Sequence, residues 1–182
     1  MAASLDSLNR LALLCGLAVG FAAQRRNARI MLAESCTGGL ASHWITRIAG
    51  SSHWFDGAIV CYSNPVKSHL VLVPQDTLSA HGAVSAQTAL ALAQGVRHHH
   101  AESLKGATLH PASALFSAAI TGIAGPGGAT PGKPVGTVFF AWSGPAGARA
   151  ERRQFTGGRL EIQAQAAAWA CSGLVSALLK RP

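Results

Sequence analysis

Residues 29–39 read Arg-Ile-Met-Leu-Ala-Glu-Ser-Cys-Thr-Gly-Gly, and this stretch decides the fold. The apolar run at 29–33 has the length of a buried strand, and it ends in a polar loop around Ser35. From Gly39 to Ile48 the apolar spacing becomes helical. A strand that passes through a short loop into a helix is typical of α/β domains. We therefore expect Ser35 to lie at the end of a buried strand.

Helices and strands alternate on both sides of this stretch. A helix is expected from Asp6 or Ser7 to about Gln24, and others at about 85–96, capped by Ser85, and at 159–179. Further strands are expected at 58–62, 115–120, 135–142 and 148–155, the last two forming a hairpin. Residues 98–111, which include His98-His99-His100, show no clear periodicity, and we expect a surface insertion there.

This alternation favours an α/β layered domain with a mixed sheet, in which ligands usually lie at the carboxyl ends of strands. Three of the expected strand ends carry polar or glycine-rich loops, at Ser35, Ser63 and Thr121. These loops are therefore the first places to look for a functional site.

The bulk composition indicates one globular domain over residues 1–182, because 49% of the residues are apolar and 12% are charged. The four cysteines form no Cys-x-x-Cys pair, which fits reduced thiols in a cytoplasmic protein. The longest apolar run, at 11–23, is shorter than a membrane span, and basic residues follow it where a signal peptide would carry them before it. We expect a cytoplasmic protein without a membrane partner.

The net charge of +8 raises the question of nucleic-acid binding. The basic residues stand in short groups, at 25–29 and 149–153, without the interleaved aromatic residues that single-strand binders use for stacking. An anionic small-molecule substrate, or plain surface charge, therefore accounts for the charge better than a nucleic-acid partner.

Ser35 is a candidate nucleophile because backbone N–H groups at a strand-to-helix turn can stabilise an oxyanion or hold a phosphate. The alternative is simple helix capping by Ser35 or Thr37. No Gly-x-Ser-x-Gly elbow surrounds Ser35 and no His/Asp pair is evident, so a triad is disfavoured. Cys36 is a weaker nucleophile candidate, because nothing nearby would lower the pKa of its thiol.

Lys67 is the candidate base, in the segment Tyr62-Ser63-Asn64-Pro65-Val66-Lys67 after an expected strand. A free lysine is almost entirely charged near neutral pH, so a base role requires burial or cationic neighbours to lower its pKa by about 3. The alternative is a solvated lysine on a helix surface.

The glycine-rich segment 121–134 lets backbone approach a ligand closely. Its Gly127-x-x-x-x-Gly132-Lys133 pattern imitates a P-loop, but Pro134 replaces the required Ser or Thr and a strand follows, so we reject an ATPase. Arg159 could hold a phosphate or be an exposed helix arginine. The histidine run lacks spaced carboxylate or thiol partners, so no metal site is expected.

Six ordered blocks of the sequence together resemble the CinA C-terminal domain family: they lie at 34–39, 50–55, 62–64, 81–85, 121–126 and 133–138. The resemblance implies a compact α/β/α sandwich with a mixed sheet that commonly dimerises. It also implies a nicotinamide-nucleotide amidase, in its standalone form, that converts nicotinamide mononucleotide to nicotinic acid mononucleotide and ammonia without a cofactor.

Carried over by position, the resemblance implies catalytic roles for Ser35, Lys67 and Tyr62. Substrate-binding roles are expected for residues of the loops that follow the strands: Thr37, Gly38, Gly39, Asn64, Thr121, Gly122, Gly125 and Arg159. The chain departs from the family pattern at Pro65 and Val66, where the family usually has Glu-Ala, at Gly158, where it usually has Asp, and at Gln163, where it often has Arg.

The expected mechanism has neutral Lys67 taking the proton of Ser35, with Tyr62 relaying it or orienting the groups. Two other functions stay open. The departures could leave a catalytically silent nucleotide-binding module, and the charge together with the family's association with competence could indicate a DNA-related protein.

Overall fold

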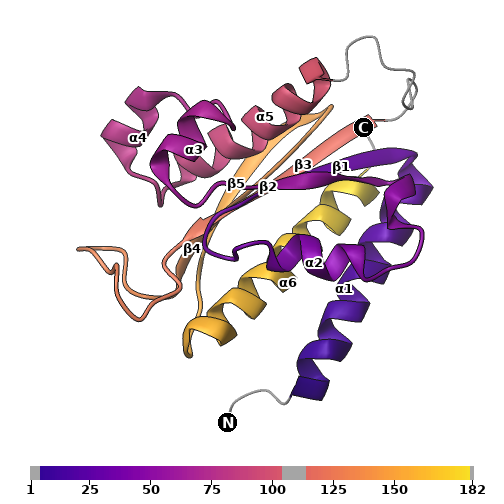
Figure 1. Ribbon diagram of the computed structural model, residues 1–182, viewed down its shortest axis with the longest axis horizontal. Helices are drawn as coiled ribbons and strands as arrows, with labels where there is room; N and C mark the ends of the chain where they lie inside the picture. Colours follow the sequence, from indigo (N-terminus) through magenta and orange to yellow (C-terminus); the bar gives the residue numbers. More distant parts are fainter. Residues whose placement is uncertain (1–4, 104–113, 181–182) are drawn as a thin grey trace.

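The structure is a computed structural model that describes residues 5–103 and 114–180 (Figure 1). Its elements are, in chain order, α1 (Leu5–Arg26), β1 (Ala28–Glu34), α2 (Leu40–Thr46), η1 (Ser51–His53), β2 (Phe55–Val60), α3 (Asn64–His69), α4 (Gln75–His81), α5 (Ala86–Ser103), β3 (Ala114–Gly122), β4 (Thr137–Gly144), β5 (Gly147–Gln154) and α6 (Arg159–Leu179).

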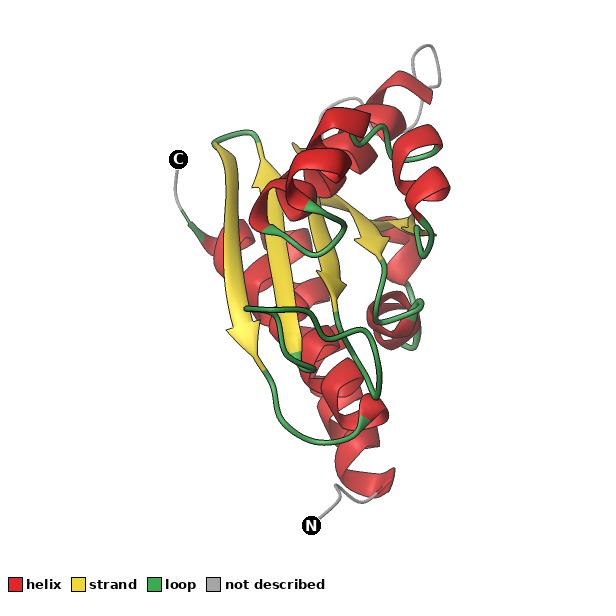
Figure 2. Ribbon diagram, turned by 90° about the vertical axis from the view of Figure 1, so that its left-hand side faces the viewer, coloured by secondary structure: helices red, strands yellow, loops and turns green. Residues whose placement is uncertain are grey.

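The five strands form one mixed sheet in the order β2-β1-β3-β4-β5. Strand β1 pairs in parallel with β2 and with β3, whereas β4 runs antiparallel to β3 and β5 antiparallel to β4. Figures 1 and 2 show α1, α2 and α6 on one face of the sheet and α3, α4 and α5 on the other. The predicted α/β fold with helices on both faces is confirmed.

Two apolar clusters, one on each face, hold the layers together. On the α6 face, the Trp142 ring is buried and its Nε1–H donates to the Ala170 carbonyl oxygen at 3.0 Å. A side chain at Gly173 would meet the same ring at 2.0 Å, so α6 approaches β4 this closely only because Gly173 has no Cβ. These contacts fix this part of α6 against β4.

Most predicted elements are confirmed within a few residues, and the N-cap of α5 is as expected, because Thr88 N–H donates to Ser85 Oγ at 3.1 Å. Strand β2 lies earlier than the predicted 58–62 because its backbone pairs with β1 from Phe55, which lies opposite Ile30. The short helices α3 and α4 were not predicted as helices.

The prediction that His98–His100 lie in an irregular insertion is wrong, because α5 continues through them to Ser103. His100 Nε2 lies 2.6 Å from Asp56 Oδ2, which ties this end of α5 to β2. The rest of the expected insertion, at 104–111, lies outside the described residues.

Two helices are long and apolar enough to cross a membrane by length and composition alone, at Asp6–Arg26 and Arg159–Leu179. Core helices pass the same test, and half of the tested window of α6 is buried against the protein interior. For α1, 33% of the tested window is buried. This helix is also longer than the apolar run at 11–23, whose short length was the reason to expect no membrane span.

Candidate active site

Ser35 lies where β1 ends, at the carboxyl edge of the sheet. Its backbone N–H donates to the Ile120 carbonyl oxygen of β3 at 2.9 Å, which fixes the serine between two parallel strands. The chain then turns sharply through Gly38 and Gly39, whose φ angles of 63° and 99° are left-handed and favour glycine. The Ser35 side chain is almost fully buried.

The helix that follows Ser35 is capped by Glu34 and not by a hydroxyl. The Glu34 carboxylate is fully buried and accepts from the N–H groups of Gly39, Ala41 and Ser42 at 3.2, 3.1 and 2.8 Å. The N-cap residue Gly39 makes no side-chain capping bond. The alternative that Ser35 caps this helix is therefore wrong, and the Ser35 hydroxyl is not engaged by the helix N-terminus.

Lys67 extends from α3 to Ser35. Its Nζ lies 3.1 Å from Ser35 Oγ, 2.7 Å from the Cys61 carbonyl oxygen and 3.0 Å from the Tyr62 carbonyl oxygen. The side chain is only 1% exposed, so the alternative of a solvated surface lysine is wrong. Ser63 positions the helix by capping it, because its Oγ accepts from Val66 N–H.

Burial lowers the pKa of Lys67 from its ordinary value. The three contacts suit the neutral amine: its two N–H groups can donate to the two carbonyl oxygens, which directs the nitrogen lone pair at the Ser35 hydroxyl. This is the arrangement that a general base and its nucleophile require.

The neighbouring thiols are not nucleophiles at neutral pH. Burial raises the pKa of Cys36 to about 12, and burial also raises the pKa of Cys61 to about 11. Both sulfurs therefore stay protonated where an enzyme would work. This burial explains why Cys36 is a weaker candidate nucleophile than Ser35.

Two backbone N–H groups next to Ser35 are free to stabilise an anion. Within residues 5–103 and 114–180, the N–H groups of Cys36 and Thr37 donate to no acceptor, while Gly38 N–H is already bonded to the Ser35 carbonyl oxygen. Free N–H groups directly after a nucleophilic serine are the usual components of an oxyanion hole.

A cavity of about 280 Å³ opens in front of Ser35 and Lys67. It brings together most of the predicted site residues, namely Ser35, Lys67, Tyr62, Asn64, Thr121, Gly122, Gly125 and Arg159. The Thr121 hydroxyl itself donates to the Ala83 carbonyl oxygen at 2.7 Å and so fixes the cavity wall.

Arg159, the first residue of α6, closes one side of this cavity. Its guanidinium donates to the Gly125 carbonyl oxygen at 2.8 Å and to the Tyr62 hydroxyl at 3.0 Å. Two of its five N–H groups are thus used, and the others can meet an anion. The Tyr62 phenol therefore contacts Arg159, while Lys67 contacts only the Tyr62 main chain.

Three predicted substrate-binding residues lie elsewhere. Thr37, Gly38 and Gly39 line a neighbouring cavity of about 490 Å³ beside α1, α2 and α6. The Thr37 hydroxyl is buried and has no hydrogen-bond partner within the described residues. The amide groups of Gly38 and Gly39 are occupied by Ser35 and Glu34, so these glycines shape the loop.

Gln163 and Glu34 are site residues that the sequence did not single out for these roles. Gln163 Nε2–H donates to the Cys36 carbonyl oxygen at 2.8 Å and so connects α6 to the loop after Ser35. At Gly158, another departure from the family pattern, the backbone N–H is capped by Glu161 at 2.7 Å. No group of three metal-binding side chains occurs in the described parts of the chain.

The fold and this cavity define an α/β domain with a buried serine–lysine pair at the carboxyl edge of its sheet. The chain belongs to the CinA family, because residues 16–178 match the CinA C-terminal domain. A nicotinamide-nucleotide amidohydrolase, PncC, of Escherichia coli K12 is 41% identical over 157 residues, which cover 86% of this chain and 88% of that protein.

Larger relatives share the same domain. A CinA-like protein of Anaeromyxobacter dehalogenans is 44% identical over 142 residues, covering 78% of this chain but 32% of that protein, so the chain spans about a third of such relatives. The crystal structure of the competence damage-inducible protein A of Klebsiella pneumoniae superposes with a TM-score of 0.81 at 29% identity, covering 94% of this chain and 99% of that one.

Proposed function

We propose that the chain is a nicotinamide-nucleotide amidohydrolase that converts nicotinamide mononucleotide to nicotinic acid mononucleotide and ammonia. The observation that carries the proposal is the contact of 3.1 Å between the buried Lys67 amine and the Ser35 hydroxyl, both of which line the cavity. The name and the 41% identity of the Escherichia coli relative support the choice of substrate.

In the proposed reaction, neutral Lys67 accepts the Ser35 proton as Oγ attacks the carboxamide carbon. The carbonyl oxygen becomes an oxyanion that accepts from the N–H group of Cys36, which lines the cavity with Ser35. Collapse of this intermediate breaks the C–N bond, and Lys67 returns its proton to the leaving nitrogen, which departs as ammonia. Water then attacks the serine ester with Lys67 again as base, which releases the carboxylate and restores Ser35.

The same cavity offers groups for the rest of the substrate. Arg159 has unused N–H groups that can pair with the phosphate, and the backbone of Gly125 and its neighbours allows close approach to the ribose. Asn64, exposed at the cavity rim, can hydrogen-bond a ribose hydroxyl or the carboxamide.

The test is ammonia release from nicotinamide mononucleotide by the purified chain. Ser35→Ala and Lys67→Ala should each lower kcat by about a thousandfold or more, because they remove the nucleophile and the base. Ser68→Ala is the matched control: this serine lies beside Lys67 on α3, bonds only to helix carbonyls and should leave kcat unchanged. Binding of the nucleotide without turnover by the unmodified chain would refute the amidase and leave a nucleotide-binding module.

A further inference from the structure

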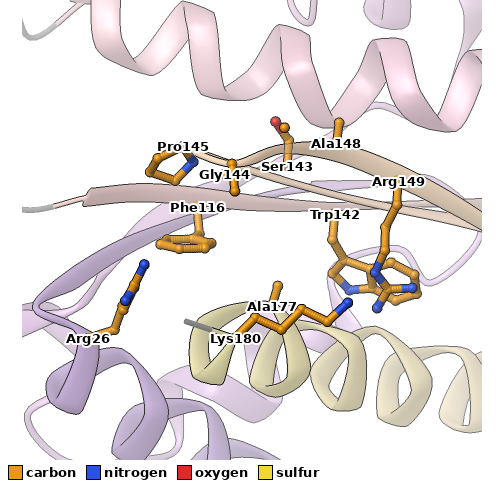
Figure 3. A pocket seen from close by; sticks show the side chains of 12 residues that line it. Arg26, Phe116, Trp142, Ser143, Gly144, Pro145, Ala148, Arg149, Ala177 and Lys180 are labelled. Atoms are coloured by element: carbon orange, nitrogen blue, oxygen red, sulfur yellow. The ribbon is translucent and has the colours of Figure 1, made fainter. Parts of the chain in front are cut away.

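A second cavity lies at the opposite end of the sheet from Ser35. It has a volume of about 220 Å³ and lies between the β4–β5 hairpin and the last turns of α1 and α6. Figure 3 shows Phe116 and Trp142 directed from the strands toward α6, where Ala177 faces them. The proposed amidase mechanism uses none of these residues.

Three basic side chains line this cavity, and among residues 5–103 and 114–180 its lining contains no carboxylate. They are Arg26 at the end of α1, Arg149 on β5 and Lys180 directly after α6. Arg26 and Lys180 contact no carboxylate within the described chain. Figure 3 shows the Lys180 side chain directed along α6 toward Arg149, whereas Arg26 lies at the other end of the cavity, beside Phe116. Like charges that line one cavity repel each other, and a bound anion would relieve this repulsion.

Arg149 is only partly neutralised. Its Nη1 lies 3.4 Å from Glu151, while the other oxygen of that carboxylate lies 2.5 Å from Arg153 Nη2. The shorter contact with Arg153 engages most of the charge of Glu151, which leaves Arg149 available to a ligand.

The cavity wall is preorganised. The Trp142 ring stacks on Phe140 with centroids 5.8 Å apart, and the Arg149 guanidinium lies over the Trp142 ring, 4.1 Å from its centroid. Arg149 is therefore held in place before any ligand arrives, which lowers the entropic cost of binding. The apolar wall of Phe116 and Trp142 also excludes water, which strengthens a charge pair formed beside it.

We propose that this cavity binds a phosphate group, either as free phosphate or as the phosphate of a small ester. A phosphate monoester carries a charge near −2, which Arg149 and Lys180 together can balance, whereas a carboxylate carries a charge of only −1. Arginine forks pair with phosphate oxygens in a bidentate manner. The cavity volume of about 220 Å³ has room for a phosphate group, and the rest of an ester would extend from it into solvent.

Amide chemical shifts in a two-dimensional NMR titration provide the test, because they report each cavity separately. Inorganic phosphate and adenosine monophosphate are titrated at about 150 mM salt, where nonspecific attraction is screened. We expect saturable shifts at Gly147 and Ala148, whatever happens at Gly125 and Gly128 of the catalytic cavity. Equal affinity for the two probes would identify free phosphate as the ligand, and tighter binding of the nucleotide would identify an ester.

Variants that remove single charges distinguish a specific phosphate site from nonspecific attraction to a basic surface. Lys180→Ala should weaken binding about tenfold, because it removes one charged contact to the phosphate. Arg26→Gln should weaken it less, because Arg26 acts from the other end of the cavity. Arg25→Ala is the matched control: Arg25 lies in the same last turn of α1 and is exposed, but it does not line the cavity. An equal loss in the Arg25 variant, or no saturable shift at Gly147 and Ala148, would overturn the proposal.

Discussion

Lys67 and Ser35 meet through a contact of 3.1 Å between Nζ and Oγ, although they come from different elements and are separated by 32 residues. Ser35 is held by β3 through its backbone, and Lys67 by two carbonyl oxygens at the end of β2. Each partner is thus fixed by the sheet, and the pair is in place before substrate binds. Such preorganisation is what a nucleophile and its base need.

The pH dependence of the reaction should follow Lys67. Because burial lowers the pKa of this lysine below its ordinary value of 10.5 and only the neutral amine acts as base, kcat/KM should rise with pH and level off above the lowered pKa. The measurement is kcat/KM for ammonia release from about pH 6 to about pH 10. Lys67→Arg should be inactive throughout, since arginine stays charged; a rate that falls across the alkaline range would contradict the base role.

Glu34 should be essential for stability as well as for the position of Ser35. In Glu34→Ala, three N–H groups at the start of α2 lose their charged acceptor inside the protein, so we expect a loss of about 3 kcal/mol or more in the free energy of unfolding. Glu34→Gln keeps an acceptor oxygen and should lose less. Urea unfolding measures both.

Glu161→Ala is the matched control for Glu34, because Glu161 caps α6 through one exposed bond to Gly158 N–H. That loss should be about 1 kcal/mol. If Glu34→Ala lowered the free energy of unfolding no more than Glu161→Ala does, the Glu34 carboxylate would not be what holds the loop after Ser35 in place.

The strand, loop and helix around Ser35 could be predicted because their apolar spacing is long enough to show a period, and the same holds for α6. The helices α3 and α4 were missed because their six or seven residues hold few apolar positions at helical spacing, whereas the apolar pattern of α2, also seven residues long, continues to Ile48. The burial of Lys67 could not be predicted from the sequence either. The residues next to Lys67 in the sequence do not indicate that α3 places its amine against the Cys61 carbonyl oxygen, directly after β2.

Tyr62 is the residue whose expected role is most changed by its place in the structure. Its hydroxyl bonds to Arg159, and its contact with Lys67 is through the main-chain oxygen, which a phenylalanine would keep. Tyr62→Phe should therefore raise KM severalfold, by loosening Arg159, and leave kcat nearly unchanged. Steady-state kinetics decide, because a proton relay through the phenol would instead lower kcat by about a hundredfold or more.

His100 should make the fold sensitive to acid. Its Nε2 contacts Asp56, which also pairs with Arg29, and burial together with the Arg29 charge lowers the pKa of the imidazole. The folded chain then binds fewer protons at this site than the unfolded chain. The stabilisation is therefore complete above about pH 6.5 and is lost as pH falls through the lowered pKa.

His100→Gln removes this titration while it keeps a donor near Asp56. The difference in unfolding free energy between the unmodified chain and His100→Gln should thus shift in favour of the variant between about pH 7.5 and about pH 5. His98→Gln is the control, because His98 lies half a turn away on α5 and is exposed. Urea unfolding at the two pH values gives the comparison. A difference that stays constant for His100→Gln would show that the Arg29–Asp56 pair holds the two elements together without help from the histidine.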